Sequence, residues 1–293
     1  MQDQPAHAHA HAHAQVEGDA DLERRFGGLR RLYGDVGCAR IRGAHVVVVG
    51  VGGVGSWAVE ALARSGVAEL TLIDLDHVSE SNINRQVQAL GSTLGQAKAE
   101  ALRVRVADIH PACKVNAIEE FVDDSNWPGL LTAPVSAVID ACDQVRAKAV
   151  LAAWSVASNT LLVSVGAAGG KQRAQAVEVA DLADVTHDPL LASLRQRLRQ
   201  HHGAARKGSM GVRCVFSREA LTMPAETCDV DGSLNCHGYG SSVSVTATFG
   251  MVAAGEVLSA LAALGSDHEA VAKLDIIEGL TGVVSSVGRA ADF

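Results

Sequence analysis

The chain has 293 residues, of which 48% are hydrophobic and only 3% aromatic, and its formal net charge is −8. This length allows two domains or one large α/β domain, with a core built from Ala, Val and Leu. The acidic balance excludes a protein that coats polyanions with its whole surface, although it allows a local basic patch. Six cysteines without a CxxC pair, and the lack of a secretory signal, predict a reducing, cytoplasmic setting with free thiols.

The first 18 residues alternate Ala with His and have no apolar periodicity, which predicts a disordered tail; weak metal capture by the histidines is the alternative. Residues 19–42 are predicted to be helical. Four of the arginines in this segment lie close together ahead of the first strand. We expect them either to be solvated charges or to contact an anion at a nearby phosphate site. They are Arg24, Arg25, Arg30 and Arg31.

A nucleotide-binding unit is predicted over residues 46–76. Residues 46–49 are four valines, which is typical of a strand buried on both faces of a parallel sheet. A glycine turn, a helix and a second buried strand ending in Asp74 complete one half of a doubly wound sheet. The glycines let backbone N–H groups approach a phosphate at a helix N-terminus, and Asp74 is placed to bind ribose hydroxyls. The turn contains Gly50, Gly52, Gly53 and Gly55.

Later segments continue this alternation. We expect further strands over residues 115–121, 135–139, 161–165, 175–179 and 212–216, and helices over 95–110, 145–158, 188–202 and 243–264. The pattern predicts a doubly wound, Rossmann-like α/β fold with a mostly parallel sheet, helices on both faces and a C-terminal extension. The last helix is apolar enough to span a membrane, but Glu256 and its small residues favour a buried or interface helix.

Several polar side chains should share a crevice with the glycine turn, because ligands of open α/β sheets bind outside the carboxyl ends of the strands. Asp140 and Asp143 follow a buried strand, while Asn82, Arg85 and Lys98 follow the acidic strand end. An arginine and a lysine facing one crevice suit a triphosphate. Asp143 adds a hard oxygen ligand for Mg²⁺. Each residue alone could be structural, but together they favour ATP with Mg²⁺.

Five segments, GVGGVG, IDLD, SNINRQ, GQAKAE and IDACDQVRAK, resemble the ATP-dependent adenylating enzymes of the HesA/MoeB/ThiF superfamily, relatives of ubiquitin-activating enzymes. The resemblance implies that Arg85 and Lys98 are catalytic and that Asp143 holds Mg²⁺. It also implies an ATP-binding Rossmann-like half over residues 19–170. The nucleotide contacts that it implies are Gly50, Gly52, Gly53, Gly55, Asp74, Asn82, Arg85, Lys98, Asp143 and Gln144.

A second set of segments, RRFGGLRRLYG, HDPL, GVRCVFS and TATFG, narrows the resemblance to the members that modify tRNA. Those members cyclise threonylcarbamoyladenosine next to the anticodon. The implied reaction transfers AMP to the threonyl carboxylate, after which the carbamoyl group closes the ring and expels AMP, with net loss of water. The implied partners are the anticodon loop of tRNA, a second copy of the chain in a homodimer, and a sulfur-transfer protein; no membrane is implied.

Two departures from the superfamily pattern affect this interpretation. Members that activate sulfur carriers usually hold zinc with two CxxC pairs, and this chain has no such pair. We therefore expect neither a zinc site nor activation of a sulfur carrier. In many members the second arginine of an RYxRQ opening reaches the phosphates of a partner subunit. Here the opening is RFGGLRR, so Arg25, Arg30 or Arg31 would have to serve.

The C-terminal half, residues 171–293, carries a basic segment and a Cys/Gly loop. The densest basic residues, Arg195, Arg199, Arg206 and Lys207, are the predicted tRNA surface; the alternative is a solvated helix. Cys236, beside His237, is either a nucleophile or sulfur-relay thiol, or a thiol packed in a loop. Three other functions stay open: an NAD-dependent oxidoreductase, an activator of a sulfur-carrier or ubiquitin-like protein, and a non-catalytic adapter for sulfur transfer.

Overall fold

The structure is a computed structural model that describes residues 21–222 and 239–263. In these ranges seven strands form one sheet in the order β3-β2-β1-β4-β5-β7-β6. Neighbouring strands are parallel except at the edge, where β6 runs antiparallel to β7. The strands are β1 (His45–Val49), β2 (Glu69–Ile73), β3 (Lys114–Ile118), β4 (Ala137–Asp140), β5 (Leu161–Val165), β6 (Val177–Asp181) and β7 (Arg213–Ser217).

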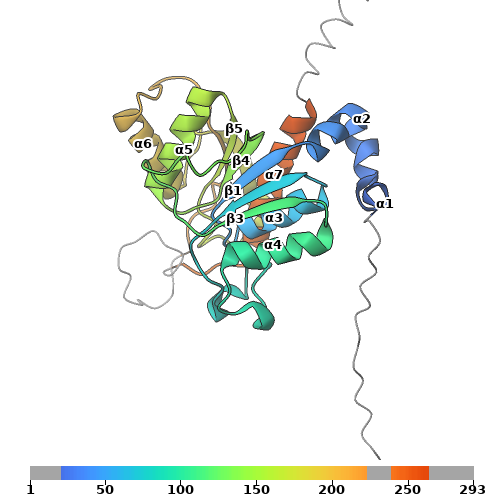
Figure 1. Cartoon of the computed structure of the whole chain (residues 1–293). Coiled ribbons are helices and arrows are strands. Elements are labelled where there is room, and N and C mark those ends of the chain that lie inside the picture. Colours follow the sequence, from blue (N-terminus) through green and yellow to red (C-terminus); the bar gives the residue numbers. More distant parts are fainter. Residues whose placement is uncertain (1–20, 223–238, 264–293) are drawn as a thin grey trace, which may run out of the picture.

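Helices cover both faces of this sheet (Figure 1), with α3, α4 and α7 on one face and α5 and α6 on the other. The helices are α1 (Leu22–Phe26), α2 (Gly28–Arg42), α3 (Gly55–Arg64), α4 (Lys98–Ile109), α5 (Val145–Ser158), α6 (Pro189–His201) and α7 (Val243–Ala263). Three short 3₁₀ turns are η1 (Glu80–Asn82), η2 (Gly91–Thr93) and η3 (Ala174–Ala176). The predicted doubly wound, mostly parallel α/β fold is confirmed. Strands from both predicted halves of the chain lie in the same sheet.

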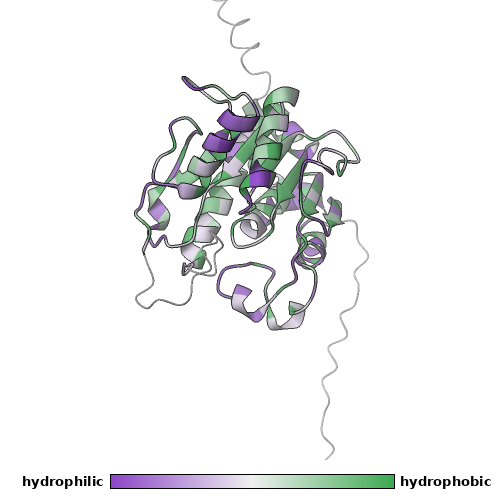
Figure 2. Cartoon of the chain, turned by 90° about the vertical axis from the view of Figure 1, so that its left-hand side faces the viewer, coloured by the Kyte–Doolittle hydropathy of each residue, from purple (hydrophilic) through white to green (hydrophobic). Residues whose placement is uncertain are grey.

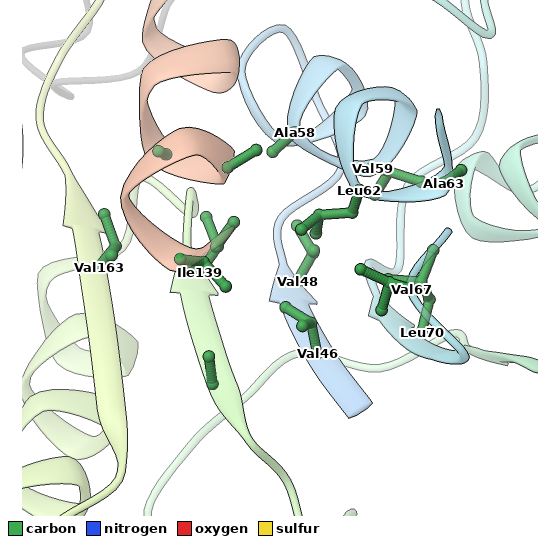
Figure 3. Close-up of a cluster of buried hydrophobic side chains, with 14 of the residues drawn as sticks. Val46, Val48, Ala58, Val59, Leu62, Ala63, Val67, Leu70, Ile139 and Val163 are labelled. Carbon is green, nitrogen blue, oxygen red and sulfur yellow. The ribbon is translucent and has the colours of Figure 1, made fainter. Parts of the chain in front are cut away.

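Strand β1 is the centre of the core. Val46 and Val48 point to the face covered by α3 and α7, where Leu62 and Ile139 pack against them (Figure 3). The alternate residues Val47 and Val49 belong to the cluster on the opposite face. Because both faces of β1 are buried, its sequence is a continuous apolar run instead of an alternating one. Colouring by hydropathy shows these hydrophobic strands enclosed by the helices (Figure 2).

Helix α7 is a core helix of this fold. It is long and apolar enough to cross a membrane by length and composition, but half of its apolar window is buried in the described part of the protein. Phe249 and Val257 lie in the same cluster as β1. A Cβ at Gly250 would collide with the carbonyl oxygen of Val54, so α7 passes directly against the start of α3. The predicted buried helix is therefore observed.

The N-terminal helix differs from its prediction. Residues 19–42 were expected to form one helix, whereas the structure has α1 and α2, and Gly34 interrupts α2 with φ of +71°. Glycine adopts this left-handed conformation without the steric penalty of other residues. The kink turns the segment that carries Arg30 and Arg31 away from the part of α2 that precedes β1.

Candidate active site

The site lies at a topological switch point. From β1 the chain continues to β2 and β3 on one side, whereas β4 and β5 lie on the other side. The carboxyl ends of β1 and β4 are adjacent, since Val49 pairs with Asp140. Open α/β sheets bind ligands in the crevice at such a point. The glycine turn and the loop after Asp140 therefore meet, as predicted.

Only glycine fits at two positions of this turn. Gly50 has φ of +79°, and a Cβ on it would lie 2.8 Å from the Cα of Cys142. A Cβ on Gly55 would collide with the carbonyl oxygen of Gly50. Gly55 is the first residue of α3, so the turn leads into a helix N-terminus whose backbone N–H groups favour an anion.

Asp74 ties the second strand to this turn. Its Oδ2 accepts a hydrogen bond from the backbone N–H of Val51 at 2.7 Å, and its Oδ1 accepts one from Asp76 at 2.9 Å. Burial raises the pKa of the Asp74 carboxyl above its ordinary value. Since each carboxylate oxygen has two lone-pair sites, Asp74 retains acceptors for ribose hydroxyls.

Arg85 lies over the glycine turn. A Cβ on Gly53 would be 3.3 Å from both Cγ and Cδ of Arg85. The carbonyl oxygen of Arg85 accepts a hydrogen bond from the Trp57 indole at 2.9 Å. Asn82 is buried, and its Oδ1 accepts from the backbone N–H of Ser79 at 3.1 Å. The side-chain amide oxygen of Asn82 therefore stabilises the turn that carries Arg85.

Lys98 is held at the first position of α4. Its Nζ lies 2.7 Å from Oδ2 of Asp76, and its backbone N–H donates to the Asp76 carbonyl at 2.9 Å. The Lys98 side chain is only 8% exposed, whereas that of Asp76 is 59% exposed. The ammonium is therefore fixed beside Asp74 and Asp76, at the end of β2 next to the glycine turn.

Asp143 and Gln144 are exposed at the end of the loop after β4. Asp143 has no hydrogen-bond or ion-pair partner in the described ranges, so its carboxylate is free to bind a cation. No group of three or more His, Cys, Asp or Glu residues that could hold a metal by itself occurs in the described part of the chain. Mg²⁺ commonly takes one or two carboxylates together with substrate phosphates, and Asp143 fits that mode.

A buried ion pair between Lys148 and Asp140 anchors the loop that follows β4. Nζ of Lys148 lies 3.1 Å from Oδ2 of Asp140, and both side chains are fully buried. Burial acts to lower the pKa of Lys148, but the Asp140 carboxylate outweighs it and raises that pKa. Asp140 Oδ1 accepts from the backbone N–H of Cys142 at 3.3 Å. Burial raises the pKa of the Cys142 thiol well above its ordinary value, which leaves it a poor nucleophile.

Arg25, one of the four N-terminal arginines, lies away from the glycine turn of its own chain and contacts the end of α4 instead. Phe26 of α1 packs on Gly66 and His110, which precede β2 and β3 at the amino-terminal edge of the sheet. Figure 1 shows α2 and the teal β2–α4 segment at opposite ends of the view. Arg25 donates to the carbonyl oxygens of Asp108 (2.9 Å) and Ile109 (2.6 Å).

The predicted tRNA surface also lies away from the glycine turn. Its basic loop precedes β7, which runs parallel to β5, so the loop lies at the amino-terminal edge. Arg195 donates to the carbonyl oxygens of Leu182 (3.0 Å) and Val185 (2.8 Å). Arg199 donates to the loop backbone, at 3.2 Å to Ala205 and 3.4 Å to Arg206. The side chains of Arg206 and Lys207 are exposed and have no partner in the ranges the structure describes.

Cys236 lies outside the described residues, so the two interpretations of its thiol stay open. The chain on either side of residues 223–238 meets at Gly170, which follows β5. Its N–H donates to the carbonyl oxygen of Gly240 at 2.9 Å, and its carbonyl accepts from the N–H of Thr222 at 2.9 Å. Both flanks are thus anchored at the carboxyl-terminal edge, the edge that carries the glycine turn.

Sequence reasoning missed Trp57, Asn84 and Lys148 as parts of the site. Trp57 lies two residues after the glycine turn, and Asn84 lies inside the SNINRQ segment. Their closeness in sequence to predicted site residues was the signal that could have identified them. Lys148 ends the IDACDQVRAK segment, and its spacing of eight residues from Asp140 did not reveal that both side chains are buried together.

The topological switch point, the glycine turn that leads into α3, and the cationic and acidic side chains beside it define an α/β nucleotide-binding protein with a phosphate site at a helix N-terminus. Within that class, the chain belongs to the ThiF family, whose sequence profile matches residues 26–288.

Two known proteins are similar over most of their length. The tRNA threonylcarbamoyladenosine dehydratase of Haemophilus influenzae is 42% identical over 246 residues, which are 82% of this chain and 94% of the relative. The crystal structure of E. coli tRNA N6-threonylcarbamoyladenosine dehydratase in complex with ATP has a TM-score of 0.78 and 43% identity, with 86% of this chain and 99% of that chain covered. The complex of the E. coli protein with AMP has a TM-score of 0.77 and 43% identity, covering 86% and 100%.

Proposed function

We propose that this protein is an ATP-dependent enzyme that dehydrates threonylcarbamoyladenosine in tRNA by adenylating its threonyl carboxylate. The observation that carries the proposal is the convergence of Arg85, Lys98 and a free Asp143 around the glycine turn. The similarity to E. coli tRNA N6-threonylcarbamoyladenosine dehydratase, crystallised with ATP and with AMP, supports the substrate.

The reaction needs an electrophilic carboxyl carbon. A threonyl carboxylate oxygen attacks the α-phosphorus of ATP and pyrophosphate leaves; the carbamoyl group then attacks the acyl carbon, loses a proton and expels AMP. Arg85 and Lys98 would offset negative charge as it grows on the phosphates. Asp143 would hold Mg²⁺, which when bound supplies Lewis-acid stabilisation of the phosphate oxygens. Since ring closure is intramolecular, positioning of the substrate contributes much of the remaining acceleration.

The test is mass spectrometry of nucleosides from tRNA incubated with the protein and ATP. We expect loss of one water from threonylcarbamoyladenosine with wild-type protein. Arg85→Ala, Lys98→Ala and Asp143→Ala should each lower the rate about a hundredfold or more, because each removes a charged contact to the transition state. Arg103→Ala is the matched control, since Arg103 is an exposed arginine paired with Glu100 on α4. Near-normal rates in all three variants would contradict the adenylation mechanism.

We propose that tRNA phosphates meet the exposed residues Arg206 and Lys207 within the predicted basic segment. Their loop lies at the edge away from the glycine turn, so it would contact the anticodon stem while the modified base reaches ATP. Replacing both with alanine should lower the slope of log K against log salt by up to about 2. Arg103→Ala with Lys114→Ala is the control of equal charge, and an unchanged slope in the Arg206/Lys207 variant would exclude this surface.

We further infer a homodimer in which Arg31 reaches the phosphates of the partner subunit. Arg25 is held by two backbone carbonyls, and Arg30 pairs with Glu23 and Asp35 at 3.1 and 3.2 Å. Arg31 is exposed and has no partner among the described residues, so of the three it is the one available. Mixing inactive Arg31→Ala and Arg85→Ala subunits should restore about a quarter of wild-type activity, because half of the dimers have one complete site. No restoration would exclude the shared site.

We infer a cytoplasmic setting, supported by four free cysteines in the described ranges and by the packing of α7 inside the fold. A sulfur-transfer protein remains a proposed partner. It would act at Cys236. If this chain binds such a partner without consuming ATP, it is an adapter for sulfur transfer and not an enzyme. ATP turnover in the nucleoside assay therefore separates the two roles.

A further inference from the structure

The guanidinium of Arg85 is held by only one of its nitrogens. Nη1 donates to the carbonyl oxygen of Ser81 at 2.9 Å and to Oδ1 of Asn84 at 3.0 Å. Nε and Nη2 have no acceptor among the residues that the structure describes. Because guanidinium is a rigid planar fork, fixing Nη1 with two acceptors fixes the plane of the whole group. The Nε–Nη2 edge then remains for a bidentate contact with a phosphate.

Asn84 is itself tied to a distant part of the chain. Its Nδ2 donates to the carbonyl oxygen of Ser241 at 3.2 Å, across 157 positions of sequence. Ser241 lies two residues before α7, and Thr246 in the first turn of that helix would contact a Cβ on Gly53 at 3.4 Å. The side chain of Asn84 therefore links the anchored nitrogen of Arg85 to the start of α7, which borders the glycine turn.

We propose that Asn84 is a positioning residue for Arg85, with its amide acting as a bridge between the guanidinium and α7. This inference rests on the proposed role of Arg85 in activating ATP. The amide uses its oxygen for Arg85 and its nitrogen for Ser241, so both ends of the side chain are engaged although it is exposed. Without Asn84, Ser81 alone would hold Nη1, and the guanidinium plane would be free to rotate about that contact.

The test compares Asn84→Ala in two backgrounds, wild type and Arg85→Ala. In the wild-type background we expect the single-turnover rate constant of tRNA-dependent adenylation, measured with enzyme in excess, to fall about tenfold. A loss of this size is typical of a lost hydrogen bond to a charged group. KM for ATP should change less than twofold, because ground-state binding keeps Lys98 and the glycine turn. In the Arg85→Ala background the same substitution should change the rate less than twofold, because the group it positions is gone.

Ser81→Ala is the matched control. It removes a neighbouring exposed polar side chain but keeps the backbone carbonyl that accepts from Arg85, so its rate should stay within twofold of wild type. A loss of less than twofold in Asn84→Ala, or an equal loss in both backgrounds, would overturn the proposal. If the wild-type protein does not adenylate tRNA in this assay, the proposed function fails, whereas either outcome above in an active wild-type protein overturns only the role of Asn84, which keeps the two failures distinguishable.

Discussion

Lys148→Met tests how the active-site loop is supported by the buried pair beneath it. The Lys148 ammonium donates to Oδ2 of Asp140 at 3.1 Å and to the carbonyl oxygen of Val165 at 2.7 Å, with no exposure to solvent. Methionine keeps an unbranched side chain but leaves the Asp140 carboxylate buried without its counter-charge. Removing one partner of a buried ion pair costs about 3–5 kcal/mol. Because Ser164 Oγ still donates to Asp140 at 2.7 Å, we expect about 3 kcal/mol, near the lower end.

Urea unfolding followed by tryptophan fluorescence measures this loss of free energy of unfolding. Lys114→Met is the control, since Lys114 forms an exposed pair with Glu69 at 2.8 Å and should cost less than about 1 kcal/mol. The double variant Asp140→Asn with Lys148→Met should recover much of the loss, because no charge is then buried. If Lys148→Met destabilises the protein no more than Lys114→Met, the reasoning about the buried charge is refuted.

Three further predictions concern other parts of the protein. Burial acts to raise the pKa of Glu60, but hydrogen bonds from Arg105 and Arg64 outweigh it and hold that pKa below 4.5. The stability advantage of wild type over Glu60→Gln should therefore be full above pH 4.5 and shrink as the pH falls through the lowered pKa, measured by urea midpoints; a difference that does not change with pH contradicts this. Gly55→Ala should abolish the thermal shift produced by ATP, whereas Gly91→Ala, where a Cβ meets nothing within 4 Å, should keep it. Cys236→Ser should cyclise tRNA within about tenfold of wild type if the ring closes by direct attack. Adenylate formation without cyclisation would instead reveal a covalent step.

Local pattern was enough to predict the centre of the fold and the glycine turn of the candidate nucleotide site. The four valines of β1 and the glycine turn define strand, turn and helix within a few residues of one another, and the structure confirms them. Parallel strands end at one edge, so the sequence also predicted that Asp74 and Asp143 would flank the same crevice. These inferences needed only the hydrophobic period of each element and its direction in the sheet.

Contacts between distant elements were decided only by the tertiary structure. The sequence showed a dense basic segment, but packing commits Arg195 to the carbonyl oxygens of Leu182 and Val185 and leaves Lys207 exposed. The sequence showed arginines before β1, but the chain enters a parallel strand at its amino-terminal edge. Arg25 of α1 therefore binds the carbonyl oxygens at the end of α4, away from the glycine turn. Composition fixes which charges a chain carries, whereas the acceptors they meet depend on which helices and loops pack side by side.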